Sequence, residues 1–250
     1  MKRDYFKSMW EKMQKEGYFQ NHADYSDHFG QEPSHDERVM DAKLLELDFL
    51  EDEIFMPFAY SQELERSVKR TESKWLYEMF QLPTSGVALD LGCGFGRTTS
   101  WMAERYEKVI ASDISTVVIE EAKRNLKALH NIEFCVNDAD SIPAEVGNNT
   151  LNLAYVFTVF QHIHRDFAAS ILKELAAALK PEGKVVFNLL SDINEQVDDG
   201  AENTEWIIGY SKKQAVALVE NSGLKLDRLV RWYRPENEVS WLWVCAQSIG

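Results

Sequence analysis

The chain has 250 residues, a formal net charge of −14 and three cysteines. This length suits one α/β domain with an appendage better than two full domains. The acidic balance argues against a nucleic-acid partner, because such binding depends largely on neutralising phosphates. Apolar stretches all fall short of the about 18 residues of a membrane span, and the N-terminus lacks a signal-peptide core. We therefore expect a cytoplasmic protein with no membrane partner.

The first part of the chain is expected to be separate from the core. Residues 1–60 carry many charged and aromatic side chains, and leucines at helical spacing predict a helix over residues 41–55. A second helix is expected over residues 62–80 and leads into the first core strand. We predict a helical or irregular lid over residues 1–60 and a core domain over residues 61–250.

A polar stretch inside this first part contains enough potential ligands to suggest a metal site. Its spacing matches no compact site, and polar irregular segments are commonly solvated, so we expect no metal. The three cysteines form no C-x-x-C pair and are expected to be reduced structural thiols. The potential ligands in the stretch are His22, Asp24, Asp27, His28, His35 and Asp36.

Strands and helices alternate from residue 87 onward. Residues 224–230 and 239–247 are expected to form the last two strands with no helix between them, so the final strand should be antiparallel. The alternation implies right-handed crossovers and predicts a Rossmann-like, doubly wound α/β sheet of seven strands, mostly parallel. The other expected strands cover residues 87–91, 108–112, 132–137, 151–157 and 184–189, and the expected helices cover residues 97–105, 115–129, 166–179 and 211–222.

A glycine turn follows the first core strand. Gly92, Gly94 and Gly96 alternate with other residues, and such turns let a ligand approach the backbone where a Cβ would collide. A dinucleotide fingerprint needs its third glycine at the place of Arg97, so NAD is disfavoured. Counted from Asp90, the spacing D-x-G-x-G-x-G resembles the first motif of class I S-adenosylmethionine-dependent methyltransferases.

Carboxylates follow the next two strands. Asp113 ends the second strand about 20 residues past the glycine turn, where a carboxylate can accept both ribose hydroxyls of an adenosine ligand. The alternative is that Asp113 only caps the helix that begins near Ser115. After the third strand, Asp138 and Ala139 resemble the adenine-contacting segment of the same family. That resemblance implies that Asp138 accepts from the adenine amino group and that Ala139 supplies a backbone N–H, whereas the alternative is an ordinary acidic loop.

The resemblance to class I methyltransferases covers about residues 75–247 and rests on four motifs in order. It implies S-adenosyl-L-methionine as the cofactor. Asp90 would hold the amino group of the cofactor through water or backbone contacts. Ile114 and Phe157 are expected as further cofactor contacts.

The segment after the fourth strand carries the candidate catalytic residue, His162. Imidazole titrates near neutrality, so His162 is the hypothesised general base for an oxygen or nitrogen nucleophile. The alternative is that His162 only shapes the pocket. Phe160, Trp206 and Tyr210 are weaker candidates for substrate contact, because aromatic side chains supply planar apolar walls.

The favoured function is methylation of a small-molecule metabolite on oxygen or nitrogen. A protein or peptide methyltransferase is the nearer alternative. A non-catalytic S-adenosylmethionine-binding partner protein is the more distant alternative. Proteins of that class are expected to have lost parts of the cofactor motifs, whereas the glycines and carboxylates of those motifs are all present in this chain. The sequence assigns no acceptor and no oligomeric state.

Overall fold

The computed structural model describes residues 80–191, 208–234 and 239–249, together with residues 53–55 and single positions near the N-terminus. Most of the predicted lid, the helix predicted over residues 62–80 and the polar stretch between His22 and Asp36 lie outside these residues. So does Trp206. The single N-terminal positions are Lys7, Ser8, Glu11, Lys12 and Lys15.

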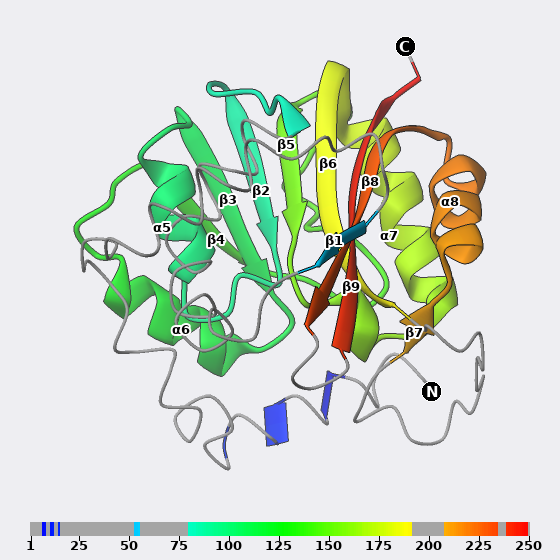
Figure 1. The fold of residues 1–250 in the computed structure, drawn as a ribbon. Coiled ribbons are helices and arrows are strands. Elements are labelled where there is room, and N and C mark those ends of the chain that lie inside the picture. Colours follow the sequence, from blue (N-terminus) through cyan, green and yellow to red (C-terminus); the bar gives the residue numbers. More distant parts are fainter. Residues whose placement is uncertain are drawn as a thin grey trace.

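The described strands form one mixed sheet in the order β1-β8-β9-β6-β5-β2-β3-β4, with β7 beside β6 (Figure 1). The strands are β1 (Glu53–Phe55), β2 (Val87–Leu91), β3 (Lys108–Asp113), β4 (Ile132–Val136), β5 (Leu151–Val156), β6 (Leu179–Ser191), β7 (Gly209–Tyr210), β8 (Leu224–Arg234) and β9 (Val239–Ser248). The helices of the core are α5 (Arg97–Ala103), α6 (Thr116–Asn125), α7 (Arg165–Ala178) and α8 (Lys212–Asn221), with a 3-10 turn, η3 (Phe160–His162), after β5.

The pairing confirms the predicted doubly wound sheet. Strands β4, β3, β2, β5 and β6 pair in parallel, one with the next. Strand β9 runs antiparallel to both of its neighbours, β6 and β8. The seven predicted strands are therefore all present, and the last is the antiparallel one. Two short strands, β1 and β7, extend the sheet beyond the prediction.

The prediction of a helix over residues 41–55 is wrong at its end. Residues 53–55 form β1, which pairs in parallel with residues 231–233 of β8. Helical spacing is a local signal, and it does not register a partner strand far along the chain. The helix predicted over residues 166–179 also ends one residue early, because the chain enters β6 at Leu179 rather than at Lys184.

Both faces of the sheet are covered, which explains the continuous apolar runs in its strands. Successive side chains of a strand point to opposite faces. In β5, Ala154 and Val156 pack with α7 and α8, whereas Leu153 and Tyr155 pack with Trp101 of α5 on the other face. Figure 1 shows α5 and α6 over the β3 and β4 side and α7 and α8 around the opposite side.

The strand order places a crevice at one edge of the sheet. From β2 the chain moves outward to β3 and β4 and then returns to β5, which pairs with the other side of β2. In open α/β sheets, ligands bind at such a switch point, outside the carboxyl ends of the strands. The segments that follow β2, β3, β4 and β5 therefore define where a site can form.

Candidate functional site

A cavity of about 280 Å³ lies at this switch point. Its walls come from the glycine turn and the start of α5, from the ends of β3 and β4, and from the segment between Phe157 and Ile163. Ile171 of α7 and Trp241 of β9 complete the lining. Of the cofactor contacts and the catalytic residue expected from the sequence, the structure brings together Gly92, Gly94, Asp113, Ile114, Ala139, Phe157 and His162 at this cavity.

The glycine turn is tied to β3 and leaves room for a ligand. The backbone N–H groups of Gly92 and Cys93 both donate to the carbonyl oxygen of Ser112, at 2.8 and 2.9 Å. Gly92 has a φ of 79°, and a Cβ there would collide with the side chain of Val159. At Gly94, by contrast, a Cβ would meet no atom within 4 Å. The turn therefore requires glycine at position 92, and its backbone at position 94 faces open space.

The carboxylate of Asp113 is held at the cavity wall by backbone groups. It accepts from the N–H of Gly94 at 3.3 Å and from the N–H of Ser115 at 3.0 Å. Burial raises the pKa of Asp113 to about 6. The cap of α6 is Ser115, whose hydroxyl accepts from the N–H of Val118. Because the cap is already provided, Asp113 is not needed for it and can serve a ligand.

Two residues of the glycine motif lie behind the cavity rather than in it. Asp90 is 1% exposed, and its carboxylate accepts a 2.6 Å hydrogen bond from the hydroxyl of Thr99. Burial raises the pKa of Asp90 to about 7. Gly96 is the N-cap of α5. A Cβ at this position would collide with the side chain of Leu126, the C-cap residue of α6. Asp90 and Gly96 thus hold α5 and the turn in place, and neither lines the cavity.

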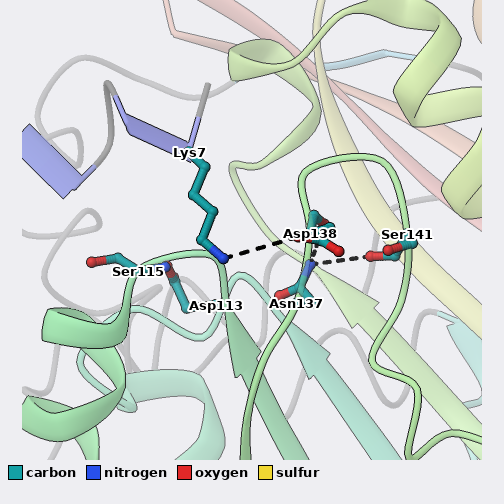
Figure 2. Close-up of polar contacts among 6 residues, drawn as sticks. All are labelled: Lys7, Asp113, Ser115, Asn137, Asp138 and Ser141. Carbon is teal, nitrogen blue, oxygen red and sulfur yellow. Dashed lines mark hydrogen bonds and ion pairs between the residues drawn. The ribbon is translucent and has the colours of Figure 1, made fainter. Parts of the chain in front are cut away.

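The loop after β4 presents a different residue to the cavity than the sequence suggested. Asn137 and Ala139 line the cavity, and Asp138 does not. The carboxylate of Asp138 lies 3.9 Å from Nζ of Lys7, and its side chain is about half exposed (Figure 2). The amide of Asn137 donates to the carbonyl oxygens of Asp138 and Ser141, at 2.8 and 3.1 Å. The sequence signal that could have found Asn137 is its position directly after the third predicted strand, since its burial is visible in the structure alone.

Aromatic packing shapes the end of the cavity near β5. The ring of Phe157 stacks on Trp243 with centroids 5.5 Å apart and an interplanar angle of 19°. The guanidinium carbon of Arg97 lies 5.5 Å from the centroid of the same ring. Arg97 and Trp241 line the cavity, and neither was among the expected site residues. Trp241 carries no local motif, whereas Arg97 stands out as the first residue after the glycines.

The backbone is strained where the chain leaves β5. Thr158 lines the cavity with a φ of 55°, a left-handed conformation that β-branched residues rarely adopt. Its N–H donates to the side-chain oxygen of Asn188 at 2.7 Å. Asn188 is 2% exposed on β6. A buried amide thus holds the strained segment that forms this wall of the cavity.

His162 lies at the cavity in its neutral form. Burial lowers its pKa to about 4, so the imidazole is uncharged at pH 7. Its Nε2 lies 3.2 Å from Nε2 of Gln161, which is buried beside it. The turn itself is closed by a 2.9 Å hydrogen bond from the His162 N–H to the carbonyl of Val159.

Two of the weaker substrate candidates, Phe160 and Tyr210, do not line the cavity. Phe160 is fully buried and packs edge-on against Phe187, with ring centroids 5.3 Å apart. Tyr210 is 1% exposed and lies under the guanidinium of Arg165 at 5.2 Å. Both rings are part of the core, because η3 and β7 turn them away from the cavity. Burial also raises the pKa of Tyr210 well above its usual range.

Within the described residues, no group of three or more histidine, cysteine, aspartate or glutamate side chains could hold a metal ion. The three cysteines are free and buried. Over the same residues, every helix is too short or too polar to cross a membrane.

A family model described as a methyltransferase domain matches residues 88–183. Among curated proteins, the chain is 30% identical over 118 residues to malonyl-[acyl-carrier protein] O-methyltransferase of Marinomonas sp. (strain MWYL1), covering 46% of the chain and 42% of the relative. It is 28% identical over 139 residues to an S-adenosyl-L-methionine-dependent Diels-Alderase of Neonectria sp. (strain DH2), covering 56% and 50%. The chain thus spans about half the length of the curated relatives it matches.

Among solved structures, the chain resembles 1,6-didemethyltoxoflavin-N1-methyltransferase of Burkholderia thailandensis, which was solved with its substrate and S-adenosylhomocysteine bound. The TM-score is 0.58 at 16% identity, over 88% of this chain and 92% of that one. At this identity the likeness shows the fold alone. Residues 88–183 therefore match a methyltransferase domain, and the described core has the fold of solved S-adenosylmethionine-dependent methyltransferases.

Proposed function

We propose that the cavity binds S-adenosyl-L-methionine and that the domain transfers its methyl group to an oxygen or nitrogen of a small-molecule acceptor. The observation that carries the proposal is the carboxylate of Asp113 at the cavity wall, held by the N–H groups of Gly94 and Ser115. A carboxylate fixed in this way at the end of a parallel strand is suited to accept both hydroxyls of a ribose.

The adenosine half of the cofactor would extend from Asp113 toward the loop after β4. In this proposal Ile114 contacts the ribose, and Ala139 supplies a backbone N–H to the adenine ring. The proposal that Asp138 accepts from the adenine amino group requires its carboxylate to leave Lys7 and turn inward. At Gly94, where a Cβ would meet no atom within 4 Å, the backbone is open to a closely approaching ligand.

The protein needs to add little to the chemistry beyond alignment. The cofactor, when bound, supplies a methyl group on a sulfonium leaving group. Apolar side chains such as Val159, Ile163 and Trp241 line the cavity and exclude water from it. We propose that His162 accepts the proton that the acceptor's hydroxyl or amine loses, because burial keeps the imidazole neutral.

The class of acceptor is supported by the names of similar proteins and not by a contact in this structure. The Burkholderia enzyme is named for methylation of a small molecule, and the Marinomonas enzyme for an acyl group carried on a protein. A protein-borne acceptor is therefore the second candidate for this chain. Transfer of labelled methyl groups to free metabolites, and not to macromolecules, is the result that favours the small-molecule acceptor.

Of the predicted lid, residues 53–55 belong to the sheet as β1, and the residues before them remain the proposed lid over this site. The ion pair between Lys7 and Asp138 supports that proposal, because it brings the N-terminal segment to the loop beside the cavity (Figure 2). A shortened chain that lacks residues 1–52, and so keeps β1, is expected to keep S-adenosylhomocysteine binding and to lose acceptor selectivity. Unchanged selectivity in that chain would reject the lid.

The cofactor proposal is tested by calorimetric titration of the full chain with S-adenosylmethionine, S-adenosylhomocysteine and NAD. We expect binding of the first two and none of NAD. The variant Asp113→Asn should weaken S-adenosylhomocysteine binding by about 10-fold or more, since hydrogen bonds to charged groups contribute more than neutral ones. Asp166→Asn, an exposed aspartate at the start of α7, is the matched control and should leave binding unchanged. Tight NAD binding without adenosylmethionine binding would overturn the proposal.

A further inference from the structure

Trp241 has no role in the transfer step proposed so far beyond excluding water. It lies near the start of β9, and its partly exposed side chain lines the cavity. Strand β9 runs antiparallel to β6, with Trp241 opposite Leu190. The start of β9 therefore lies at the same edge of the sheet as the ends of the parallel strands, where the cavity is.

The strand order separates Trp241 from the proposed adenosine half of the cavity. Across the sheet the order is β9, β6, β5, β2, β3 and β4. Asp113 ends β3 at one side, His162 lies in the turn after β5, and Trp241 comes from β9, beyond β6. An acceptor that meets the methyl group near His162 is therefore expected on the side of Trp241, away from Asp113.

The indole of Trp241 has a face available for stacking. The phenylalanine and tryptophan residues that line the cavity are Phe95 in the glycine turn, Phe157 and Trp241. Phe157 is already stacked on Trp243 and on Tyr155, with ring centroids 5.5 and 6.1 Å apart. In the part of the chain that the structure describes, no ring or cationic group lies over the indole of Trp241. A planar ligand can therefore stack there with the geometry that aromatic pairs prefer.

The side chains near Trp241 favour an acceptor with an apolar body. Val159 and Ile163 follow β5, Ile171 comes from α7, and all three line the cavity. Binding pockets of this kind hold the apolar part of a ligand, and a few polar groups fix its orientation. The polar group on this side that the proposed transfer uses is His162, which is uncharged at pH 7.

The chemistry of His162 restricts the kind of hydroxyl that the acceptor can present. Burial lowers the pKa of His162 to about 4, and a base this weak takes a proton more readily from an acidic group. A phenolic hydroxyl has a pKa of about 10. An aliphatic alcohol holds its proton about as tightly as water, whose pKa is about 15.7. A hydroxyl on an aromatic ring therefore suits His162 better than an aliphatic one.

We propose that the acceptor is a planar aromatic molecule that stacks on the indole of Trp241 and presents a ring hydroxyl to His162. This inference rests on the proposed function, which places methyl transfer near the end of β5. The hydroxyl oxygen forms a bond to the methyl carbon while the carbon–sulfur bond breaks, and the electron pair of that bond stays on sulfur. The hydroxyl proton passes to His162, so the positive charge of the sulfonium ends on the imidazole.

Calorimetry of the full chain, saturated with S-adenosylhomocysteine, tests the stacking. The probes are 2-naphthol and its saturated counterpart, 2-decalol. The unaltered protein should bind 2-naphthol about 10-fold more tightly, as expected for one aromatic pair. Trp241→Leu should bring the two affinities within about twofold, and Trp241→Phe should keep most of the difference because it keeps a ring. Phe134→Leu alters a partly exposed ring of β4 outside the cavity lining and is the matched control that should keep the full difference.

Turnover with S-adenosylmethionine tests the kind of hydroxyl. The unaltered protein should methylate 2-naphthol at least about 100-fold faster than 2-naphthalenemethanol, which has the same rings and an aliphatic hydroxyl. Trp241→Leu should raise KM for 2-naphthol about 10-fold and leave kcat within about threefold, because stacking contributes equally before and during transfer. A residue that only supported the fold would change both constants.

Several outcomes would overturn the inference. Equal binding of 2-naphthol and 2-decalol to the unaltered protein, or binding of neither, would do so even if Trp241→Leu did not fold. An undiminished preference for 2-naphthol in Trp241→Leu would reject the stacking, and equal turnover of the two naphthyl compounds would reject the ring hydroxyl. Failure of the unaltered protein to bind S-adenosylhomocysteine would instead reject the proposed function.

Discussion

The two ends of the cavity are built differently. The end near β3 and β4 is made by backbone groups and short side chains, such as the N–H of Gly94 and the carboxylate of Asp113. The end near β5 is made by packed aromatic rings, the neutral His162 and the strained Thr158. The first depends on local turn geometry, and the second depends on residues from strands distant in sequence. Changes at the first end should therefore act on cofactor affinity, and changes at the second on turnover.

The largest effect is expected at the glycine turn. Gly92→Ala places a Cβ against Val159 on a backbone with a φ of 79°. Strain and overlap together should lower the free energy of unfolding by roughly 3 kcal/mol and abolish S-adenosylhomocysteine binding. Chemical denaturation and calorimetry measure the two effects. Gly94→Ala, where a Cβ meets no atom within 4 Å, is the matched control and should lose less stability. Equal losses in both variants would contradict the steric account.

A substitution of His162 tests the end of the cavity near β5. If His162 accepts the acceptor's proton, His162→Ala should lower turnover by about 100-fold or more, within the usual range for a general base. Affinity for S-adenosylhomocysteine should stay within about twofold, because Asp113 is unaffected. The measurement is release of S-adenosylhomocysteine with a panel of hydroxyl- and amine-bearing acceptors. His164→Ala, at the N-cap of α7, serves as the control. Near-normal turnover in His162→Ala would assign His162 a purely structural role.

The pH dependence of S-adenosylhomocysteine binding tests whether Asp113 contacts the ligand. Burial raises its pKa to about 6 in the free protein, and only the charged form accepts two hydroxyl hydrogen bonds. Protonation below that pKa removes the acceptor, so affinity for S-adenosylhomocysteine should rise as the pH increases. It should be about 10-fold weaker at pH 5 than at pH 8. Calorimetry across this range should show the trend in the unaltered protein, and a flat profile there would argue against contact with Asp113.

The smallest effect is expected at Thr158. Thr158→Gly relieves the left-handed strain and should raise the free energy of unfolding by about 1 kcal/mol. Thr158→Val keeps the β-branched strain and should bring no gain. Thermal and chemical denaturation compare the two variants. A gain in both, or in neither, would show that the backbone at this position is not strained.

The same contrast explains how far the sequence could predict the site. Gly92, Gly94 and Asp113 were expected because their proposed roles follow from spacing along a strand-turn-helix-strand unit. Asn137 and Arg97 stand next to predicted residues, yet their contacts with the Ser141 loop and with Phe157 depend on the folded backbone.

The residues that sequence reasoning missed entirely come from distant strands. Trp241 reaches the cavity from β9, and Asn188 reaches Thr158 from β6. Strand β1 was missed for the same reason: its partner, β8, is distant in the sequence, whereas the local pattern of residues 41–55 favours a helix. Periodicity predicted the seven main strands of the sheet, because each is buried on the faces that the helices cover. The periodicity of a segment contains no information on which side chain from a distant strand closes a cavity.

The central claim is that this cavity is the S-adenosylmethionine site, and a crystal structure of the chain with S-adenosylhomocysteine tests it most directly. We predict that the ribose hydroxyls lie on the carboxylate of Asp113 and the adenine beside Ala139. The sulfur should then face the segment that contains His162. Density for the ligand away from the cavity, or a ribose that makes no contact with Asp113, would contradict the account.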